Sequence, residues 1–327
     1  MRLFTASVCI AAAIILCQSA EAQSSKAKTS QRIVVLAPAA ADVLMRLDVM
    51  DSIVGVTNSV SGFPLAVNVG TYMNPGLESI AALNPTLIIA GTRFNPAYAA
   101  RIGAEFFLYD PRTLDDIISL VRSLARAIGK EAQGKQLADE LQAILDGLQP
   151  PRRSVSVLYE TRATPLSLAR NNTIIRDMLE RAGMRYLYDG SAWLVSMEYL
   201  ISAQPDVYIY QHGPMNRNPI PPARRPGWDR FAACAWMVDE FDFARPNTRL
   251  FETLQMLNAI LHQDDICAAG KNCFQLYLSA LDLFSIVTLQ FHIQNIYKLY
   301  RSLGHPIRSL LWFLLLPSSA LYAALFS

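Results

Sequence analysis

The sequence has little of what metal sites and nucleic-acid-binding surfaces require. It holds 4 histidines and 5 cysteines in 327 residues, and none of them has the close spacing of a zinc site. Its 29 basic and 27 acidic residues leave a formal net charge of +2. Because binding to nucleic-acid phosphates needs a concentrated basic face, this balance argues against a nucleic-acid-binding protein.

The common catalytic motifs are absent as well. There is no Gly-x-Ser-x-Gly, no His-Glu-x-x-His, and no phosphate-binding loop ending in Gly-Lys-Ser/Thr. Gly129-Lys130 lies inside a helical pattern and lacks the glycine that should stand five residues earlier. We therefore expect no enzyme, no resident cofactor and no bare metal ion bound by protein ligands.

Both ends of the chain carry apolar segments. Residues 1–22 have the positive start, apolar run and small residues before a cleavage site that are typical of a signal peptide, so we expect export from the cytoplasm. A lipoprotein acylated at Cys17 is the alternative. Residues 264–327 form a predicted apolar helical extension, and 309–327 are free of charge over 19 residues. A membrane hairpin within 274–327, a single span, a surface-lying segment and an unrelated appended region all remain open.

Export would leave Cys234, Cys267 and Cys273 in the mature chain. In an oxidising compartment Cys267 and Cys273 could close a small disulfide loop, and free thiols are the alternative.

The middle of the chain alternates short apolar runs with helical patterns. The runs 32–37, 52–57, 86–90 and 155–159 predict buried strands, and 113–149 predicts a helix to about Ile128 and a longer one to about Leu148. This alternation is typical of parallel sheets covered by helices on both faces. We predict an α/β protein with an N-terminal lobe at 32–128, an interlobe helix at 129–150 and a C-terminal lobe at 151–263.

An internal repeat links the two predicted lobes. Glu78 precedes Pro85 by seven residues, and Glu198 precedes Pro205 by seven residues, with a helical stretch between and an apolar strand after in both cases. The offset is 120 residues, and it indicates two related units.

Several segments resemble the periplasmic binding proteins for iron–siderophores, haem and vitamin B12. In the first half these are 32–38, 53–57, Val69-Gly70, 74–78 and 83–90. In the second half they are 175–183, Trp228 with Phe231, and 245–249 leading to a last helix near His262. The resemblance covers roughly 32–263. It implies two Rossmann-like lobes joined by one long rigid helix, with a metal chelate held between them and delivered to a membrane permease whose ATPase is a separate chain.

The resemblance also implies roles for two carboxylates. Family members place one acidic residue on each lobe to meet arginines of the ABC permease, and Glu78 and Glu198 match those positions. A simpler reading puts each carboxylate in the first turn of a helix, which the helix dipole favours. Asn74 as the cap and Pro75 as the first helical residue would suit that reading for Glu78.

Ligand contacts are expected from loops that follow strands. The predicted ligand-binding residues are Tyr72, Arg93, Arg162, Arg170, Trp193 and His212. Arginine suits carboxylate, catecholate or phosphate groups, and aromatic rings suit a flat or bulky chelate. Tyr72 also suggests the tyrosinate iron ligand of haem-binding relatives. One departure from the family is the stretch from Ala39 to Asp42, where relatives carry a hydroxyl residue and a glutamate, which predicts fewer polar contacts there.

An iron–siderophore is the predicted ligand, and cobalamin or haem are the alternatives. A membrane-tethered sensor or interaction module with the same fold is the alternative from another class of function.

Overall fold

The computed structural model describes residues 31–226, 228 and 233–270. The chain divides into two compact units, 1–267 and 268–327, and every element named below belongs to the first. The predicted signal peptide and the predicted span at 309–327 lie outside the described residues. Among the described helices, none combines the length and apolar composition that a bilayer span needs.

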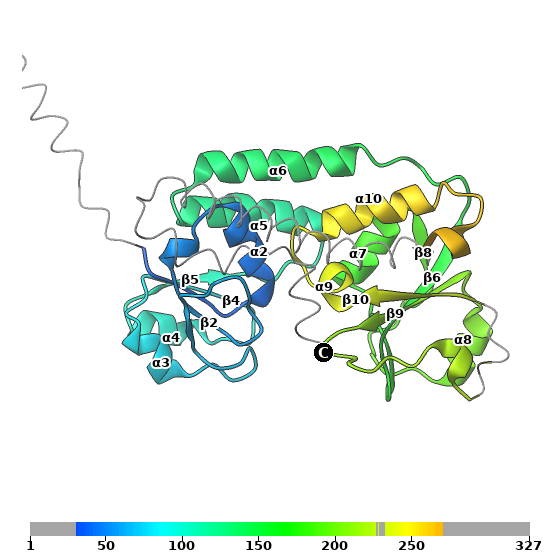
Figure 1. Cartoon of the computed structure of the whole chain (residues 1–327), viewed down its shortest axis with the longest axis horizontal. Coiled ribbons are helices and arrows are strands. Elements are labelled where there is room, and N and C mark those ends of the chain that lie inside the picture. Colours follow the sequence, from blue (N-terminus) through cyan, green and yellow to red (C-terminus); the bar gives the residue numbers. More distant parts are fainter. Residues whose placement is uncertain (1–30, 227, 229–232, 271–327) are drawn as a thin grey trace, which may run out of the picture. The chain divides into compact units, whose positions relative to one another are not determined.

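The first sheet is parallel throughout, with strand order β3-β2-β1-β4-β5. Figure 1 labels β2, β4 and β5 of this sheet. Its strands are β1 (Ile33–Val35), β2 (Ile53–Val56), β3 (Val67–Asn68), β4 (Leu87–Ala90) and β5 (Glu105–Leu108). Around it lie α2 (Pro38–Arg46), η1 (Met50–Ser52), α3 (Leu77–Ala82) and α4 (Pro96–Arg101). Val34 and Ile88 of the sheet form one core with Ile80 of α3 and Ala99 of α4. Because β1 and β4 are buried at every residue, their sequences are continuous apolar runs.

The second sheet has the order β10-β9-β6-β7, with β8 also paired to β6. Its strands are β6 (Val155–Ala163), β7 (Leu166–Leu168), β8 (Met184–Tyr186), β9 (Val207–His212) and β10 (Cys234–Asp239). All pairings are parallel except that of β6 with β7. The accompanying helices are α7 (Ile174–Arg181), α8 (Met197–Ala203), η2 (Pro222–Arg224), α9 (Glu240–Phe243) and α10 (Leu250–Ile260). The prediction of an α/β protein with parallel sheets flanked by helices is confirmed.

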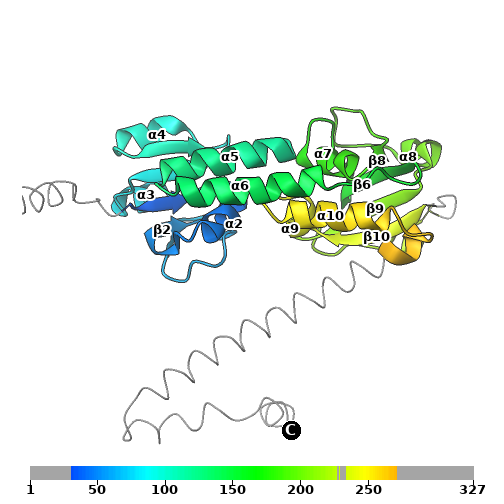
Figure 2. The same cartoon turned by 90° about the horizontal axis from the view of Figure 1, so that it is seen from above.

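Two long helices, α5 (Leu114–Ala127) and α6 (Glu131–Asp146), lie side by side (Figures 1 and 2). In the sequence they stand between the strands of the first sheet and those of the second. Thr113 and Asp116 form a capping box that starts α5. Gly134 of α6 lies against Ala125 of α5 so closely that a Cβ on Gly134 would be 2.0 Å from the Ala125 Cβ. Glycine is therefore required at this crossing.

The 120-residue repeat reappears in the backbone. Glu78 is the second residue of α3 and Glu198 is the second residue of α8. Each helix is followed by a non-glycine residue with positive φ, Asn84 at 45° and Gln204 at 40°, directly before a proline. This conformation is uncommon outside glycine, so its recurrence at the same offset supports two related units.

Several hydrogen bonds join the region of the first sheet to that of the second. Thr248 donates to Asp42 Oδ2 from its backbone nitrogen at 3.0 Å and also from its hydroxyl. The Tyr109 hydroxyl donates to the Pro246 carbonyl at 3.0 Å, and the Leu114 N–H donates to Asp177 Oδ2 at 2.8 Å. The stretch 39–42 does make a polar contact within the protein, because Asp42 bonds to Thr248, 206 residues away in the sequence.

The cysteine pairing differs from the loop considered in the sequence. Cys267 is bonded to Cys234, with the two Cα atoms 5.6 Å apart. Cys234 is the first residue of β10, and its partner stands 33 residues later, just beyond α10. The bond therefore ties the segment after α10 to the second sheet, and Cys273, the other cysteine of the loop considered in the sequence, lies outside the described residues.

Candidate functional site

A pocket of about 190 Å³ opens at the carboxyl ends of the strands of the first sheet. It is lined by Leu36, Tyr72, Met73, Asn74, Pro75, Leu77, Ala90, Gly91, Arg93, Phe94, Asn95 and Tyr98. Leu36 follows β1, Tyr72 follows β3, and Gly91 follows β4. Ligands of open parallel sheets bind at this edge, because the loops that follow the strands converge there.

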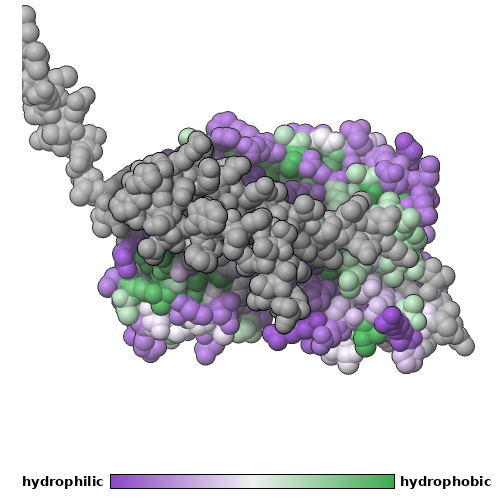
Figure 3. Space-filling model, viewed as in Figure 1, coloured by the Kyte–Doolittle hydropathy of each residue, from purple (hydrophilic) through white to green (hydrophobic). Residues whose placement is uncertain are grey.

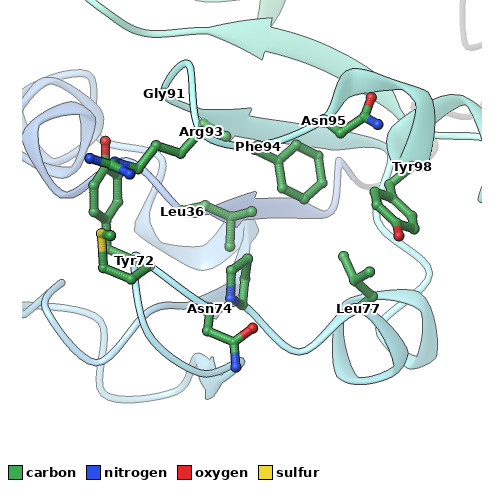
Figure 4. Close-up of a pocket in the computed structure, with 12 residues that line it drawn as sticks. Leu36, Tyr72, Asn74, Leu77, Gly91, Arg93, Phe94, Asn95 and Tyr98 are labelled. Carbon is green, nitrogen blue, oxygen red and sulfur yellow. The ribbon is translucent and has the colours of Figure 1, made fainter.

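The structure brings two predicted ligand-binding residues together in this pocket. In Figure 4 the Arg93 guanidinium lies beside Tyr72 at one end, while Phe94, Tyr98 and Leu77 lie at the other. Gly91 makes room for this arrangement, because a Cβ there would approach the Tyr72 hydroxyl to 3.0 Å. The pocket therefore offers a cation and a phenol at one end and apolar rings at the other.

The loop that carries Tyr72 is a tight turn that returns to β3. Gly70 has a φ of 107° and pairs with Pro75 across an antiparallel bridge, and the Gly76 N–H donates to the Val69 carbonyl at 2.7 Å. Asn74 and Pro75 thus belong to this turn, and Gly76 is the residue that caps α3. Their sequence assignment as cap and first helical residue is wrong, because the bridge to Gly70 holds them outside the helix.

Glu78 lines a neighbouring pocket rather than the first one. This second pocket is bounded by α3 and α4 and shares Leu77, Phe94 and Tyr98 with the first. Arg101 stands over the Tyr98 ring, with its guanidinium carbon 5.8 Å from the ring centroid. Figure 3 shows hydrophobic surface on the side of the molecule where β5 and α4 lie.

The other four predicted ligand-binding residues belong to the region of the second sheet. Arg162 lies within β6, which extends beyond the predicted end at residue 159. Arg170 stacks on Trp193, with its guanidinium carbon 4.8 Å from the ring centroid, and half of the Trp193 surface is exposed. Trp193 belongs to a segment that bridges to β7, the edge strand opposite β10. His212 ends β9 and is exposed.

β6 extends beyond its apolar residues because polar side chains near its end are buried and hydrogen-bonded. Glu160 is fully buried and accepts hydrogen bonds from the Tyr208 hydroxyl at 2.6 Å and from Arg225 Nη2 at 3.0 Å. Arg225 also lies 4.8 Å from the Trp228 ring centroid. Burial and the charge of Glu160 raise the pKa of Tyr208 well above its usual value, so this phenol stays protonated and serves as a donor. Glu160, Tyr208 and Arg225 thus find their hydrogen-bond partners inside the protein and stabilise the sheet.

The turn after β10 carries a cation that the sequence reasoning missed. Arg245 follows α9, and its guanidinium carbon lies 3.8 Å from the centroid of the Phe241 ring. Phe241 lines a small pocket together with Pro38 and residues 59–61, which follow β1 and β2 of the first sheet. In the sequence, Arg245 is notable only as the first residue of the motif 245–249, and nothing in that motif indicates a ligand contact.

No group of three or more histidine, cysteine, aspartate or glutamate side chains in the part of the chain described here could hold a metal ion.

Residues 33–234 match the family described as periplasmic binding protein, which is more than half of the chain. The chain belongs to the periplasmic binding protein family. The vitamin B12-binding protein of Pectobacterium carotovorum is 24% identical over 266 residues, covering 76% of this chain and 93% of that protein. The vitamin B12-binding protein of Vibrio campbellii is 26% identical over 203 residues, covering 58% and 74%.

Solved structures of periplasmic binding proteins share the fold. Staphylococcus aureus IsdE complexed with heme matches with a TM-score of 0.60 at 19% identity, over 71% of this chain and 99% of that one. The vitamin B12-binding protein BtuF of Vibrio cholerae matches with a TM-score of 0.55 at 20% identity, over 71% and 97%. The resemblance inferred from the sequence is confirmed. Since the family consists of substrate-binding components of transporters, the protein is not an enzyme, and the family works outside the cytoplasm.

Proposed function

We propose that this periplasmic binding protein captures a metal chelate and delivers it to the permease of an ABC importer. An iron–siderophore is the ligand proposed from the sequence, and cobalamin and haem are the other members of the class, as the names of its relatives suggest. The observation that carries the proposal is the pocket at the carboxyl edge of the first sheet. Arg93 and Tyr72 supply polar contacts there, while Phe94 and Tyr98 supply flat apolar surface (Figure 4).

Intrinsic tryptophan fluorescence of the full-length protein tests this proposal. The protein is titrated with ferric siderophores, cobalamin and haem, each of which absorbs light emitted by tryptophan. We expect saturable quenching by one of these chelates at micromolar concentration or below. A folded protein that responds to none of them would exclude chelate capture and leave a tethered sensor as the better account.

Glu78 and Glu198 are proposed to dock the protein on the permease. Both side chains are exposed, and both stand in the first turn of a helix that begins one residue earlier. The pKa of Glu198 is lowered mainly by a hydrogen bond from the Ser196 hydroxyl and further by one from a backbone N–H. Its carboxylate therefore remains ionised at neutral pH. Two fixed carboxylates, one on α3 beside the first sheet and one on α8 beside the second, would set the orientation of the protein on a partner that presents cations.

A further inference from the structure

A groove of about 370 Å³ lies between α3 and α4. Ile80 lines it and is 1% exposed, whereas the two charged residues that border the groove, Glu78 and Arg101, are both exposed. The rest of the lining is apolar or aromatic and comes from Leu77, Ala81, Phe94, Tyr98 and Ile102. The groove therefore has an apolar interior and a charged rim.

The groove continues the pocket at the carboxyl edge of the first sheet. Leu77, Phe94 and Tyr98 line both cavities. In Figure 4 these three side chains lie at the end of the first pocket that is away from Arg93 and Tyr72. The first pocket measures about 190 Å³, which is below the roughly 300–1,000 Å³ of a typical small-molecule site, and the groove is about twice as large. A ligand that fills the first pocket therefore reaches the mouth of the groove.

Aromatic packing holds the shared wall in place. The Phe94 ring stacks on Phe106 of β5, with the ring centroids 5.9 Å apart, and its centroid lies 6.3 Å from that of Tyr98. The guanidinium carbon of Arg101 is 5.8 Å from the Tyr98 ring centroid. Phe94, Phe106 and Ile102 also pack against the apolar core of the first sheet. These contacts fix the wall within the protein itself, and a fixed wall reduces the entropy lost when a ligand binds.

The size and chemistry of the groove favour a short hydrocarbon chain over a peptide. α3 and α4 have six residues each, a length of about 9 Å. An amphipathic helix that binds in a groove places anchors at i, i+3, i+4 and i+7, which takes about 11 Å before its side chains are counted. An extended peptide binds by pairing with the edge of a sheet, and this groove is bordered by two helices. A hydrocarbon chain needs only an apolar surface that removes it from water.

We propose that the groove binds an apolar arm of the chelate, an acyl, prenyl or alkyl chain, while the first pocket binds the body of the ligand. This inference rests on the proposed function and adds a chemical class: the chelate is amphiphilic, with a hydrocarbon arm attached to its metal-binding part. The arm enters between Leu77 and Tyr98 and lies against Ala81 and Ile102, which line the groove and do not line the first pocket.

Matched pairs of chelates isolate the arm. Ferric schizokinen, a citrate dihydroxamate with two acetyl groups, is compared with its analogue in which a decenoyl chain replaces one acetyl. Haem b is compared with haem o, which adds an isoprenoid chain at one vinyl group, and methylcobalamin is compared with octylcobalamin. Equilibrium dialysis of the full-length protein measures each affinity, in the dark and below the concentration at which each chelate aggregates.

Substitutions at neighbouring alanines separate the groove from the rest of the protein. Ala81→Phe places a ring in the groove and leaves the lining of the first pocket unchanged. Ala81→Leu fills the same space with a smaller side chain. Ala82→Phe is the matched control, because Ala82 is the next residue of α3, is exposed and lines neither cavity. Circular dichroism and thermal unfolding identify a loss of affinity that comes from misfolding.

For a pair that the wild type binds, we expect the member with the arm to bind about tenfold or more tightly than the member without it, because the arm is removed from water. A81F should abolish most of this preference and change the affinity for the member without the arm by less than about twofold. A81L should retain part of the preference, and A82F should retain all of it.

Other outcomes overturn the inference. If the wild type binds both members equally, or if A81F keeps the preference or weakens both members equally, the arm does not occupy the groove, and the proposed function stands. If A81F abolishes uptake by cells that express the permease while both affinities are unchanged, the groove binds the permease instead. If sedimentation shows a wild-type dimer that A81F dissociates, a second copy of the chain covers the groove. If the wild type binds none of the six chelates, the proposed function fails first, and the inference falls with it.

Discussion

Arg93 is the exposed cation of the first pocket, where it lies beside Tyr72 (Figure 4). We predict that Arg93→Gln weakens chelate binding about tenfold, because it removes one charge-assisted hydrogen bond and keeps the length of the side chain. Arg126→Gln is the matched control, since Arg126 is exposed near the end of α5 and does not line the pocket. Fluorescence titration measures both. Equal affinity of R93Q and the wild type would remove Arg93 from the site.

Asp242 gives the protein a pH dependence that one substitution can isolate. Burial raises its pKa to about 6, with Arg249 opposing the shift, and its side chain is 3% exposed. Because the folded state holds this proton more tightly than the unfolded state, the contribution of Asp242 to stability is greatest below about pH 4. It declines as the pH rises through about 6, by at most about 3 kcal/mol.

Asp242→Asn cannot ionise, so it should gain stability relative to the wild type between pH 4 and pH 7. Urea unfolding of both proteins across this range measures the difference in free energy. A difference that stays constant with pH would show that Asp242 has an ordinary pKa in the folded protein.

At the scale of the helices, α5 and α6 touch through Gly134 and Ala125. We predict that Gly134→Ala lowers the free energy of unfolding by about 1–2 kcal/mol, because the forced separation of the helices outweighs the gain in helix propensity. Gln133→Ala, at an exposed position of the same helix, is the control. The midpoint of urea unfolding distinguishes them. An unchanged or raised midpoint for G134A would mean that the helices separate without cost.

Apolar runs and helical spacing predict most elements here. The strands near 32–37, 52–57 and 86–90 and the two helices up to residue 148 follow from these patterns. The end of β6 could not be predicted, because Glu160 and Arg162 read as exposed, and only the distant Tyr208 and Arg225 make Glu160 a buried residue. Local patterns do not record such partners. The same holds for the bond between Cys234 and Cys267, which depends on where the chain after α10 returns.

The candidate site was predicted in part, for a similar reason. Tyr72 and Arg93 directly follow strands of the first sheet, so position in sequence places them near its carboxyl edge. Arg245 depends on the turn after β10 and on Phe241 beneath it, and a sequence pattern gives no sign of either. Arg170 and Trp193 were predicted as ligand contacts because they stand in loops after predicted strands, and they lie near the edge strand β7.

At the scale of the whole molecule, contacts such as those of Asp42 with Thr248 and Tyr109 with Pro246 link the two sheets. The ligand proposed for the first pocket would contact the loops that follow the strands of the first sheet. The carboxylates proposed to meet the permease lie beside both sheets, one on α3 and one on α8. An importer requires ligand binding and permease docking in one chain, and a sensor requires only ligand binding.

Uptake of the bound chelate by cells that also express the matching permease and ATPase tests the account most directly. We predict that Glu78→Ala with Glu198→Ala abolishes uptake while the chelate affinity of the purified protein is unchanged, because both side chains are exposed and neither lines the first pocket. Glu131→Ala with Glu140→Ala, which removes two exposed carboxylates from α6, should support uptake as the wild type does. Full uptake with the Glu78/Glu198 variant would contradict the account, as would a wild-type protein that binds the chelate and supports no uptake.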